Sequence, residues 1–137
     1  MQELWTQWKA KEGLANKYSI SDIIDGYEGL KIILTQDFSD ISIEILFKSS
    51  FAYHVAQEGL RLRTISTLNK QYNSEFYSQW TFFKVTNSKY LHWLSEESNT
   101  LADSYELMHI SIITDNDIVD IAASNEPKIT FLNIKKT

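Results

Sequence analysis

Residues 30–47, LKIILTQDFSDISIEILF, contain two apolar runs separated by a short polar segment. In the second run, large apolar residues at positions 41, 43, 45 and 47 alternate with the residues between them. This alternation is typical of a β-strand that buries one face. The stretch therefore predicts two antiparallel strands, 30–34 and 41–47, joined by a turn.

Upstream of these strands, the sequence favours a short helix. Leu4, Trp5 and Trp8 recur at helical spacing, and Gly13 follows where a C-terminal cap would lie. We therefore predict an amphipathic helix over residues 2–12 with its tryptophan face turned inward. A loop containing two glycines should lead from there into the first strand of the pair.

Downstream of the pair, residues 51–68 are ambiguous between strand and helix. The alternation at their start favours a strand, and Gly59 favours a turn, so we predict strand, turn and strand over this range. The polar run 69–75 is expected to be a loop.

The C-terminal half contains further elements. We predict strands at 80–85, 107–114 and 128–134, the last at a sheet edge, and a helix over 89–97 capped by Asn87 or Ser88. Thr114 and Asp117 stand at the spacing of a capping box, which predicts a short helix over IVDIAA.

This order of elements favours one α+β domain over residues 1–137, with a largely antiparallel sheet and helices packed on one face. A chain of 137 residues is long enough to bury a sizeable core. Proline-rich or serine/glycine-rich linkers are absent from the sequence, so a second domain is not indicated.

The charges are unevenly distributed along the chain. The formal net charge is −5, and the segment from Tyr90 to Pro127 contains no Lys or Arg. Such an acidic block repels nucleic acid and favours either a basic partner or a solvated face. We therefore expect no nucleic-acid partner.

The sequence indicates a cytoplasmic protein. It contains no cysteine, which excludes disulfides and thiolate chemistry and suits a reducing compartment. The first residues carry charges rather than the apolar core of a signal peptide. Apolar runs of the length needed to cross a bilayer are also missing, so we expect no membrane partner.

Motifs for metals and cofactors are not found, and we predict neither. His54, His92 and His109 are too far apart for a helical metal site, and we expect each at the surface of a strand or helix. The segment DNDIVD (115–120) lacks the glycine and the final glutamate of an EF-hand. Phosphate-binding loops and serine-nucleophile motifs are absent as well, so an enzyme is not favoured.

Exposed aromatic and acidic residues are the candidates for binding a partner. In residues 76–98, FYSQWTFFKVTNSKYLHWLSEES, strand and helix periodicity assign most aromatics to the core and leave three outside it. Together with nearby carboxylates, the predicted partner-binding residues are Trp80, His92, Trp93, Glu96, Glu97, Asp115 and Asp117.

A ligand pocket is the alternative. Arg61 and Arg63, the only arginines, would share a strand face near His54 and Tyr53, where they could hold an anionic ligand. A surface ion pair with an acidic residue is the simpler interpretation of the arginines.

The segments HVAQEGLRLRTI, WTFFKVTNSKYLHWLSEES and HISIITDNDIVDIAASNEPKITFL resemble small uncharacterised acidic bacterial proteins. The resemblance covers about the C-terminal two-thirds of the chain, and some acidic bacterial proteins of this size are toxin immunity proteins. We therefore expect a non-enzymatic, cytoplasmic protein-binding module of the immunity type, which holds a basic partner through its acidic C-terminal half. The alternatives are the anionic-ligand pocket, in a binding protein or an enzyme, and a homodimer formed through sheet edges.

Overall fold

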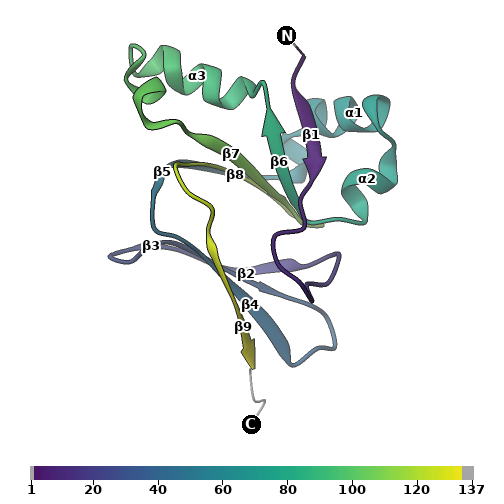
Figure 1. The fold of residues 1–137 in the computed structure, drawn as a ribbon. Helices are drawn as coiled ribbons and strands as arrows, with labels where there is room; N and C mark the ends of the chain where they lie inside the picture. The colour runs from purple at the N-terminus through teal and green to yellow at the C-terminus, as the bar shows by residue number, and fades with distance from the viewer. Residues whose placement is uncertain (1, 134–137) are drawn as a thin grey trace.

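The computed structural model describes residues 2–133, which form two antiparallel β-sheets stacked face to face, with the helices outside one of them (Figure 1). The strand order is β1-β6-β7-β8-β5 in the five-stranded sheet and β2-β3-β4-β9 in the four-stranded sheet. The α+β class and the antiparallel pairing are thus confirmed, although the strands divide into two sheets.

The five-stranded sheet consists of β1 (Leu4–Gln7), β5 (Ser50–Gln57), β6 (Phe82–Thr86), β7 (Met108–Ile113) and β8 (Asp117–Ala123). The four-stranded sheet consists of β2 (Ser19–Gly26), β3 (Gly29–Thr35), β4 (Ile41–Phe47) and β9 (Lys128–Asn133). The helices are α1 (Leu62–Gln71), α2 (Ser74–Ser78) and α3 (Lys89–Glu97), with 3₁₀ turns η1 (Glu58–Leu60) and η2 (Leu101–Tyr105).

The hairpin predicted from residues 30–47 is confirmed as β3 and β4. Ile32 lies opposite Ile45, so the alternating isoleucines of the two strands share the inner face. The glycines expected in a loop flank the two-residue turn of a second hairpin, because Gly26 ends β2 and Gly29 begins β3; strand β2 was not predicted. Gly29 has φ +125°, and a Cβ there would lie 2.3 Å from the carbonyl oxygen of Phe47, so only glycine fits this turn.

The main core lies between the two sheets. It is built from the inner faces of the central strands, and its buried members include Ile32, Leu34, Ile43, Ile45, Phe47, Phe82, Ile110, Ile112, Val119 and Ile121. A second core covers the outer face of the five-stranded sheet, where Leu68 of α1 and partly buried residues of α1 and α2 pack on Trp5, Phe83, Val85, Ile113 and Ile118. This two-core arrangement explains why the central strands are apolar on both faces.

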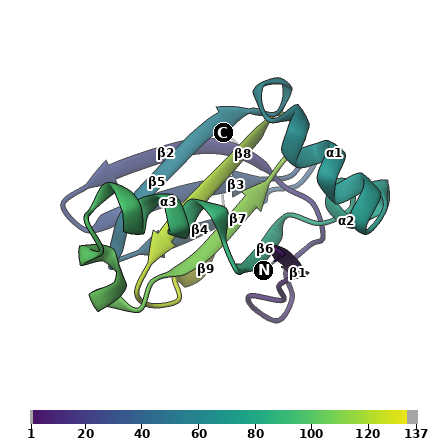
Figure 2. The ribbon, with the colours of Figure 1, turned by 90° about the horizontal axis from the view of Figure 1, so that it is seen from above.

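Figure 2 shows how the helices divide this outer face, with α1 and α2 over one end of the five-stranded sheet and α3 over the other. In α1 the buried face is formed by Leu68 together with the partly buried Ile65 and Tyr72. All the helices therefore lie on one side of the stacked sheets, as predicted.

The predicted N-terminal helix over residues 2–12 is wrong, because this segment contains strand β1. Trp5 lies opposite Val85, and its indole packs edge-on against Phe83 with ring centroids 6.0 Å apart. Burial of one large indole in the second core outweighs the weak helical preference of the segment.

The strand predicted after Gly59 and the short helix predicted over IVDIAA are also wrong. Residues 62–71 form α1, so the loop predicted over 69–75 includes the end of α1 and the start of α2. Residues 117–123 form strand β8. Thr114 Oγ1 does accept the N–H of Asp117, at 3.1 Å, but the contact closes a hairpin turn between β7 and β8. A run that is apolar on both faces suits this central strand.

The side chain of Lys17 is hydrogen-bonded to three segments that are distant from it in the sequence. Its ammonium donates to the carbonyl oxygens of Tyr77, Trp80 and Ile113 at 2.9, 3.0 and 2.8 Å. Burial lowers the pKa of Lys17 to about 8, against the attraction of nearby carboxylates. All three protons are used, so this cation has a structural role.

Strand β9 confirms the predicted edge strand up to residue 133, and the predicted residue 134 lies outside the described residues. Along residues 2–133, none of the helices is both long enough and apolar enough to span a membrane.

Candidate functional site

The junction between β6 and α3 positions the most exposed aromatic helix face. Asn87 has φ +52°, which turns the chain out of the sheet, and Ser88 then caps the helix by accepting the N–H of Leu91 at 3.0 Å. This confirms the predicted helix over 89–97 and one of its two predicted caps.

The outward face of α3 combines an indole with acidic side chains. Trp93 is 55% exposed and stacks on the ring of Tyr90, with centroids 6.4 Å apart. His92 Nε2 lies 2.9 Å from Glu96 Oε1, one helical turn further on, and Glu97 is exposed beside them. As predicted, His92 and Trp93 lie outside the partly buried side of the helix.

The turn η2 extends this exposed surface beyond the end of α3. Leu101 and Tyr105 are exposed, and the ring of Tyr105 packs against Phe51 of β5 at a centroid distance of 4.5 Å. We name these exposed residues of α3 and η2, together with the residue that follows η2, the acidic–aromatic surface: His92, Trp93, Glu96, Glu97, Leu101, Asp103, Tyr105 and Glu106.

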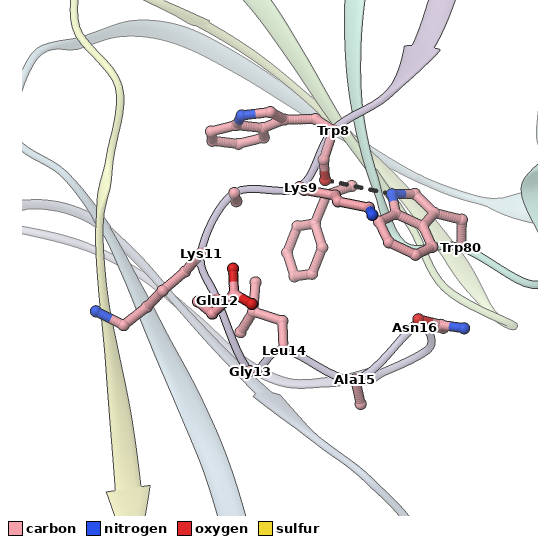
Figure 3. A pocket seen from close by; sticks show the side chains of 11 residues that line it. Trp8, Lys9, Lys11, Glu12, Gly13, Leu14, Ala15, Asn16 and Trp80 are labelled. Carbon is pink, nitrogen blue, oxygen red and sulfur yellow. Dashed lines mark hydrogen bonds between the residues drawn. The ribbon is translucent and has the colours of Figure 1, made fainter.

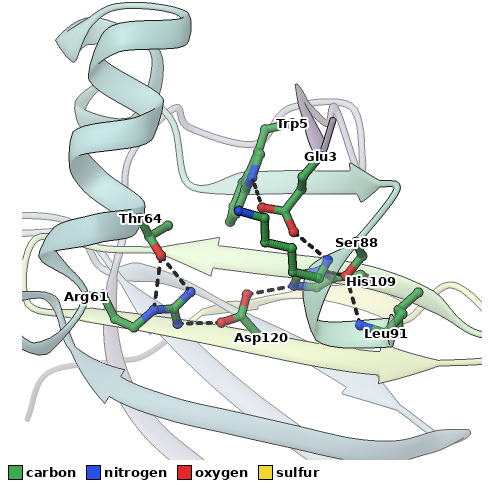
Figure 4. A network of polar contacts seen from close by, with 9 residues as sticks. Glu3, Trp5, Arg61, Thr64, Ser88, Leu91, His109 and Asp120 are labelled. Atoms are coloured by element: carbon green, nitrogen blue, oxygen red, sulfur yellow. Dashed lines mark hydrogen bonds and ion pairs between the residues drawn. The ribbon is translucent and has the colours of Figure 1, made fainter. Parts of the chain in front are cut away.

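A buried chain of polar contacts holds α3 on the sheet (Figure 4). The Ser88 hydroxyl lies 2.7 Å from His109 Nδ1, and His109 Nε2 lies 2.7 Å from Asp120 Oδ1. The other carboxylate oxygen of Asp120 accepts from Arg61, whose terminal nitrogen is 2.6 Å away. We name these four residues the polar network. It runs from the start of α3 through β7 and β8 to the start of α1.

One arrangement of protons gives every member of the polar network a partner. Because Ser88 Oγ accepts the Leu91 N–H, its own proton is free to be donated to His109 Nδ1. In this arrangement Nδ1 carries no proton, the imidazole is neutral, and its Nε2–H is donated to Asp120. With Arg61 on the second oxygen, every member of the network has a partner.

Burial alone would raise the pKa of Asp120. The hydrogen bonds from His109 and Arg61, together with the charge of Arg61, outweigh this effect and hold the pKa of Asp120 below its usual value. Asp120 is therefore a buried carboxylate at neutral pH. On the neighbouring helix, burial and the charge of Asp120 raise the pKa of the Tyr90 phenol to about 12.

Serine, histidine and aspartate in this order are also the side chains of a hydrolytic triad. Here the serine hydroxyl is engaged as a helix cap and the residue is only 7% exposed. The arginine bound to Asp120 also offsets the negative charge that would stabilise an imidazolium. The network is therefore suited to positioning α3 rather than to nucleophilic attack.

Glu3 adds a second attachment at the start of α3. One of its carboxylate oxygens accepts the N–H of Lys89 at 2.7 Å, and the other accepts the indole N–H of Trp5 at 3.1 Å. A carboxylate at this place satisfies an unpaired helix amide and interacts favourably with the helix dipole. The segment before β1 is thereby joined to the same helix.

The predicted partner-binding residues do not form one surface. Asp115 lies in the β7–β8 turn, and Asp117 begins β8. Both are at one end of β7, and η2 is at the other end. The six residues of β7 separate these two ends by about 20 Å. Trp80 is half-buried, and its indole N–H donates to the carbonyl oxygen of Trp8 at 3.3 Å. Four of the seven residues, those of α3, lie together.

The residues of the predicted ligand pocket do not converge. Tyr53 and His54 are neighbours on strand β5 and so point to opposite faces. Arg61 is engaged by Asp120, and Arg63 is exposed on α1, so the expectation that the arginines share a strand face is wrong. Arg61 does pair with an acidic residue, but that residue is buried, whereas a surface ion pair was expected.

A hollow of about 460 Å³ lies inside the loop between β1 and β2, where residues 8–16 curve past Trp80 and Phe82 (Figure 3). Trp8 and Trp80 are on its rim, and the backbone of the loop forms much of its wall. Among residues 2–133, no three His, Asp or Glu side chains gather as metal ligands would.

Sequence reasoning missed the polar network. His109 was expected at a surface, but it is 3% exposed, whereas His54 and His92 are exposed as predicted. The available signal was a polar residue inside an otherwise apolar strand, since His109 and Asp120 each interrupt such a run. Buried polar groups need partners, so two such residues predict a contact between their strands.

Comparison with known proteins adds no relative, because no protein-family model, no curated protein and no solved structure matches this chain.

Proposed function

We propose that the protein is a non-enzymatic, cytoplasmic binding protein that holds a basic protein partner on the acidic–aromatic surface. The observation that carries the proposal is the exposure of Trp93 at the centre of a helix face bordered by Glu96 and Glu97. A large aromatic residue that stays in water beside two carboxylates is characteristic of an interaction surface.

The charge of this surface favours a basic partner. Four carboxylates are exposed on it, from Glu96, Glu97, Asp103 and Glu106, and the chain has no Lys or Arg between residues 90 and 127. Opposite charge on a partner would steer its approach and fix its orientation, while Trp93, Leu101 and Tyr105 supply apolar area. A toxin domain with a basic surface fits this description, since some small acidic bacterial proteins of the kind this chain resembles are immunity proteins.

A rigid attachment supports the same role. The polar network and Glu3 fix the first turn of α3, so its exposed face is already ordered before a partner arrives. A preorganised surface loses less conformational entropy on binding. The anionic-ligand alternative has less support, because Arg61 is engaged by Asp120.

The test begins by replacing Trp93 with a photo-crosslinking benzoylphenylalanine in the source cell. We expect crosslinks to one basic protein, which would then be purified and titrated against the wild-type chain by calorimetry. The same crosslinker at Phe38, a fully exposed turn residue between β3 and β4, is the matched control.

Charge reversal then distinguishes this surface from general acidity. Glu96→Lys with Glu97→Lys should weaken binding of the purified partner at least tenfold, or about 1.4 kcal/mol. Asp115→Lys with Asp117→Lys changes the net charge equally at the other end of the sheet and should leave binding nearly unchanged. Equal losses from both pairs, or crosslinking from Phe38 alone, would contradict the proposal.

A further inference from the structure

Trp93 and Glu97 are neighbours on the outer face of α3. Residues four apart in a helix lie one turn from each other, and a helical side chain leans towards the start of its helix, so Glu97 reaches back towards the indole. Tyr90 lies on the other side of Trp93 along the helix, with its ring plane only 13° from that of the indole. Because Trp93 is 55% exposed, part of its ring surface is open to solvent beside the Glu97 carboxylate.

The carboxylate of Glu97 is not used by the chain itself. Glu96 is paired with His92, at 2.9 Å, within the same helix. Glu97 is exposed and makes no ion pair with any other residue of the range 2–133. The two adjacent acids therefore differ, because only Glu97 has its charge free for a partner.

The indole of Trp93 is not covered by a cation of the chain. Elsewhere the chain does form such a contact, since the ammonium of Lys84 lies 4.8 Å from the ring centroid of Trp8. Within the part of the chain that the structure describes, no lysine or arginine lies over Trp93. Lys89 is one turn earlier on α3, and its side chain leans towards the start of the helix, away from the indole. The exposed ring is thus available to a cation from a partner.

A flat ring beside a carboxylate favours arginine over lysine. A guanidinium is planar, so it can lie on an indole while its edge donates two hydrogen bonds to one carboxylate. The ammonium of lysine is compact and strongly hydrated, and it cannot make these contacts with the same geometry. Arginine and tryptophan are also enriched among the residues that contribute most to the affinity of protein interfaces.

We propose that Trp93 and Glu97 form a binding site for one arginine side chain of the partner, whose guanidinium stacks on the indole and pairs with the Glu97 carboxylate. This inference rests on the proposed function and names the side chain that the acidic–aromatic surface recognises. Glu96, already paired with His92, contributes to attracting a basic partner but does not hold the guanidinium.

The experiment compares tetraarginine with tetralysine, two peptides of equal charge, in NMR titrations of the purified chain. We expect tetraarginine to bind about fivefold more tightly, the gain of one exposed cation–π contact, and to shift the indole N–H signal of Trp93. Trp93→Leu, at an exposed position, should bind both peptides equally. Equal binding of the two peptides to wild type, or an arginine preference that survives in Trp93→Leu, would overturn the proposal.

Two substitutions of the same type separate Glu97 from general acidity. Glu97→Gln should weaken tetraarginine binding about threefold and reduce the preference for arginine. Glu75→Gln removes the same charge from an exposed position on α2, over the other end of the sheet, and should lower the binding of both peptides equally and slightly. Equal effects of the two substitutions would contradict the contact between the guanidinium and Glu97.

The outcomes also separate this inference from the proposed function. If the crosslinker at Trp93 captures a basic protein but the chain shows no preference for tetraarginine, the binding function is supported and the arginine site is wrong. If tetraarginine is preferred at Trp93 but no protein is captured there, the arginine site is supported and the proposed function is wrong.

Discussion

His109 Nε2 and Asp120 Oδ1 lie 2.7 Å apart, and this hydrogen bond connects β7 and β8 under the ring of Tyr90 on α3. Both residues are almost completely buried. The contact completes a line of hydrogen bonds between two helices that are far apart on the sheet. Its removal should therefore affect the stability of the whole outer layer.

Asp120→Asn should destabilise the fold strongly. The amide cannot accept two charge-assisted hydrogen bonds, and the partly buried guanidinium of Arg61 loses its counter-charge. Breaking a buried pair in this way costs about 3 kcal/mol. Urea unfolding followed by circular dichroism measures the loss. Asp103→Asn, on the exposed turn η2, is the control and should change stability by less than about 0.5 kcal/mol. A similar stability for both variants would show that the network contributes little.

Acid should remove the contribution of Asp120. Its pKa is lower in the folded chain than the usual value of 3.8, so its stabilisation is fully present above that value. It is lost as the pH falls through the lower folded pKa. The difference in unfolding free energy between wild type and Asp120→Asn should therefore be constant from near neutrality to pH 5, about one unit above the usual value, and should shrink in more acidic buffers. A difference that shrinks already near neutral pH would point to another titrating group.

Ser88→Ala should cost more than the loss of an ordinary helix cap. The serine caps α3 and also donates to His109, so alanine leaves both the Leu91 N–H and a buried imidazole nitrogen without a partner. We expect a loss of about 2 to 3 kcal/mol. Asn73→Ala removes only the cap of α2, where the side chain accepts from the Phe76 N–H, and should cost about 1 kcal/mol. Equal losses in chemical denaturation would argue against the serine–histidine bond.

Iodide quenching of fluorescence should report the different environments of the tryptophans. Trp93 is exposed, whereas Trp5 is buried in the second core. Trp93→Phe should therefore remove most of the quenchable emission, and Trp5→Phe should remove emission that iodide does not reach. If Trp93→Phe leaves the quenching constant unchanged, its indole is not the accessible one and the binding surface must be sought elsewhere.

Local periodicity predicted those elements whose buried side matches one simple pattern. Strand β4 alternates along its length, and α3 has both a cap and a helical stripe. Prediction failed where distant contacts decide the structure. Trp5 lies in a strand because its indole packs against Phe83, which is far away in the sequence. The apolar run of β8 is covered by the other sheet on one face and by helices on the other. Local sequence patterns do not contain this information.

The candidate site was predictable only in part, for a similar reason. The exposure of Trp93 followed from its position on α3, because helix periodicity separates a buried stripe from an exposed face. The prediction that Trp93 and Asp115 belong to one surface was wrong, because β7 lies between them and places them at opposite ends of the sheet. The partner of Arg61 is 59 residues away in the sequence, so the spacing of the arginines could not identify it.

The polar network also has a consequence for how the molecule opens. The start of α3 and the start of α1 are joined by consecutive hydrogen bonds through the middle of the sheet. If either helix detaches, it therefore leaves buried polar atoms of the network without partners, and these atoms also hold the other helix. The outer layer then behaves as one cooperative unit, and hydrogen exchange in α3 should require nearly the free energy of global unfolding. A partner bound to that helix would slow the unfolding of the entire chain.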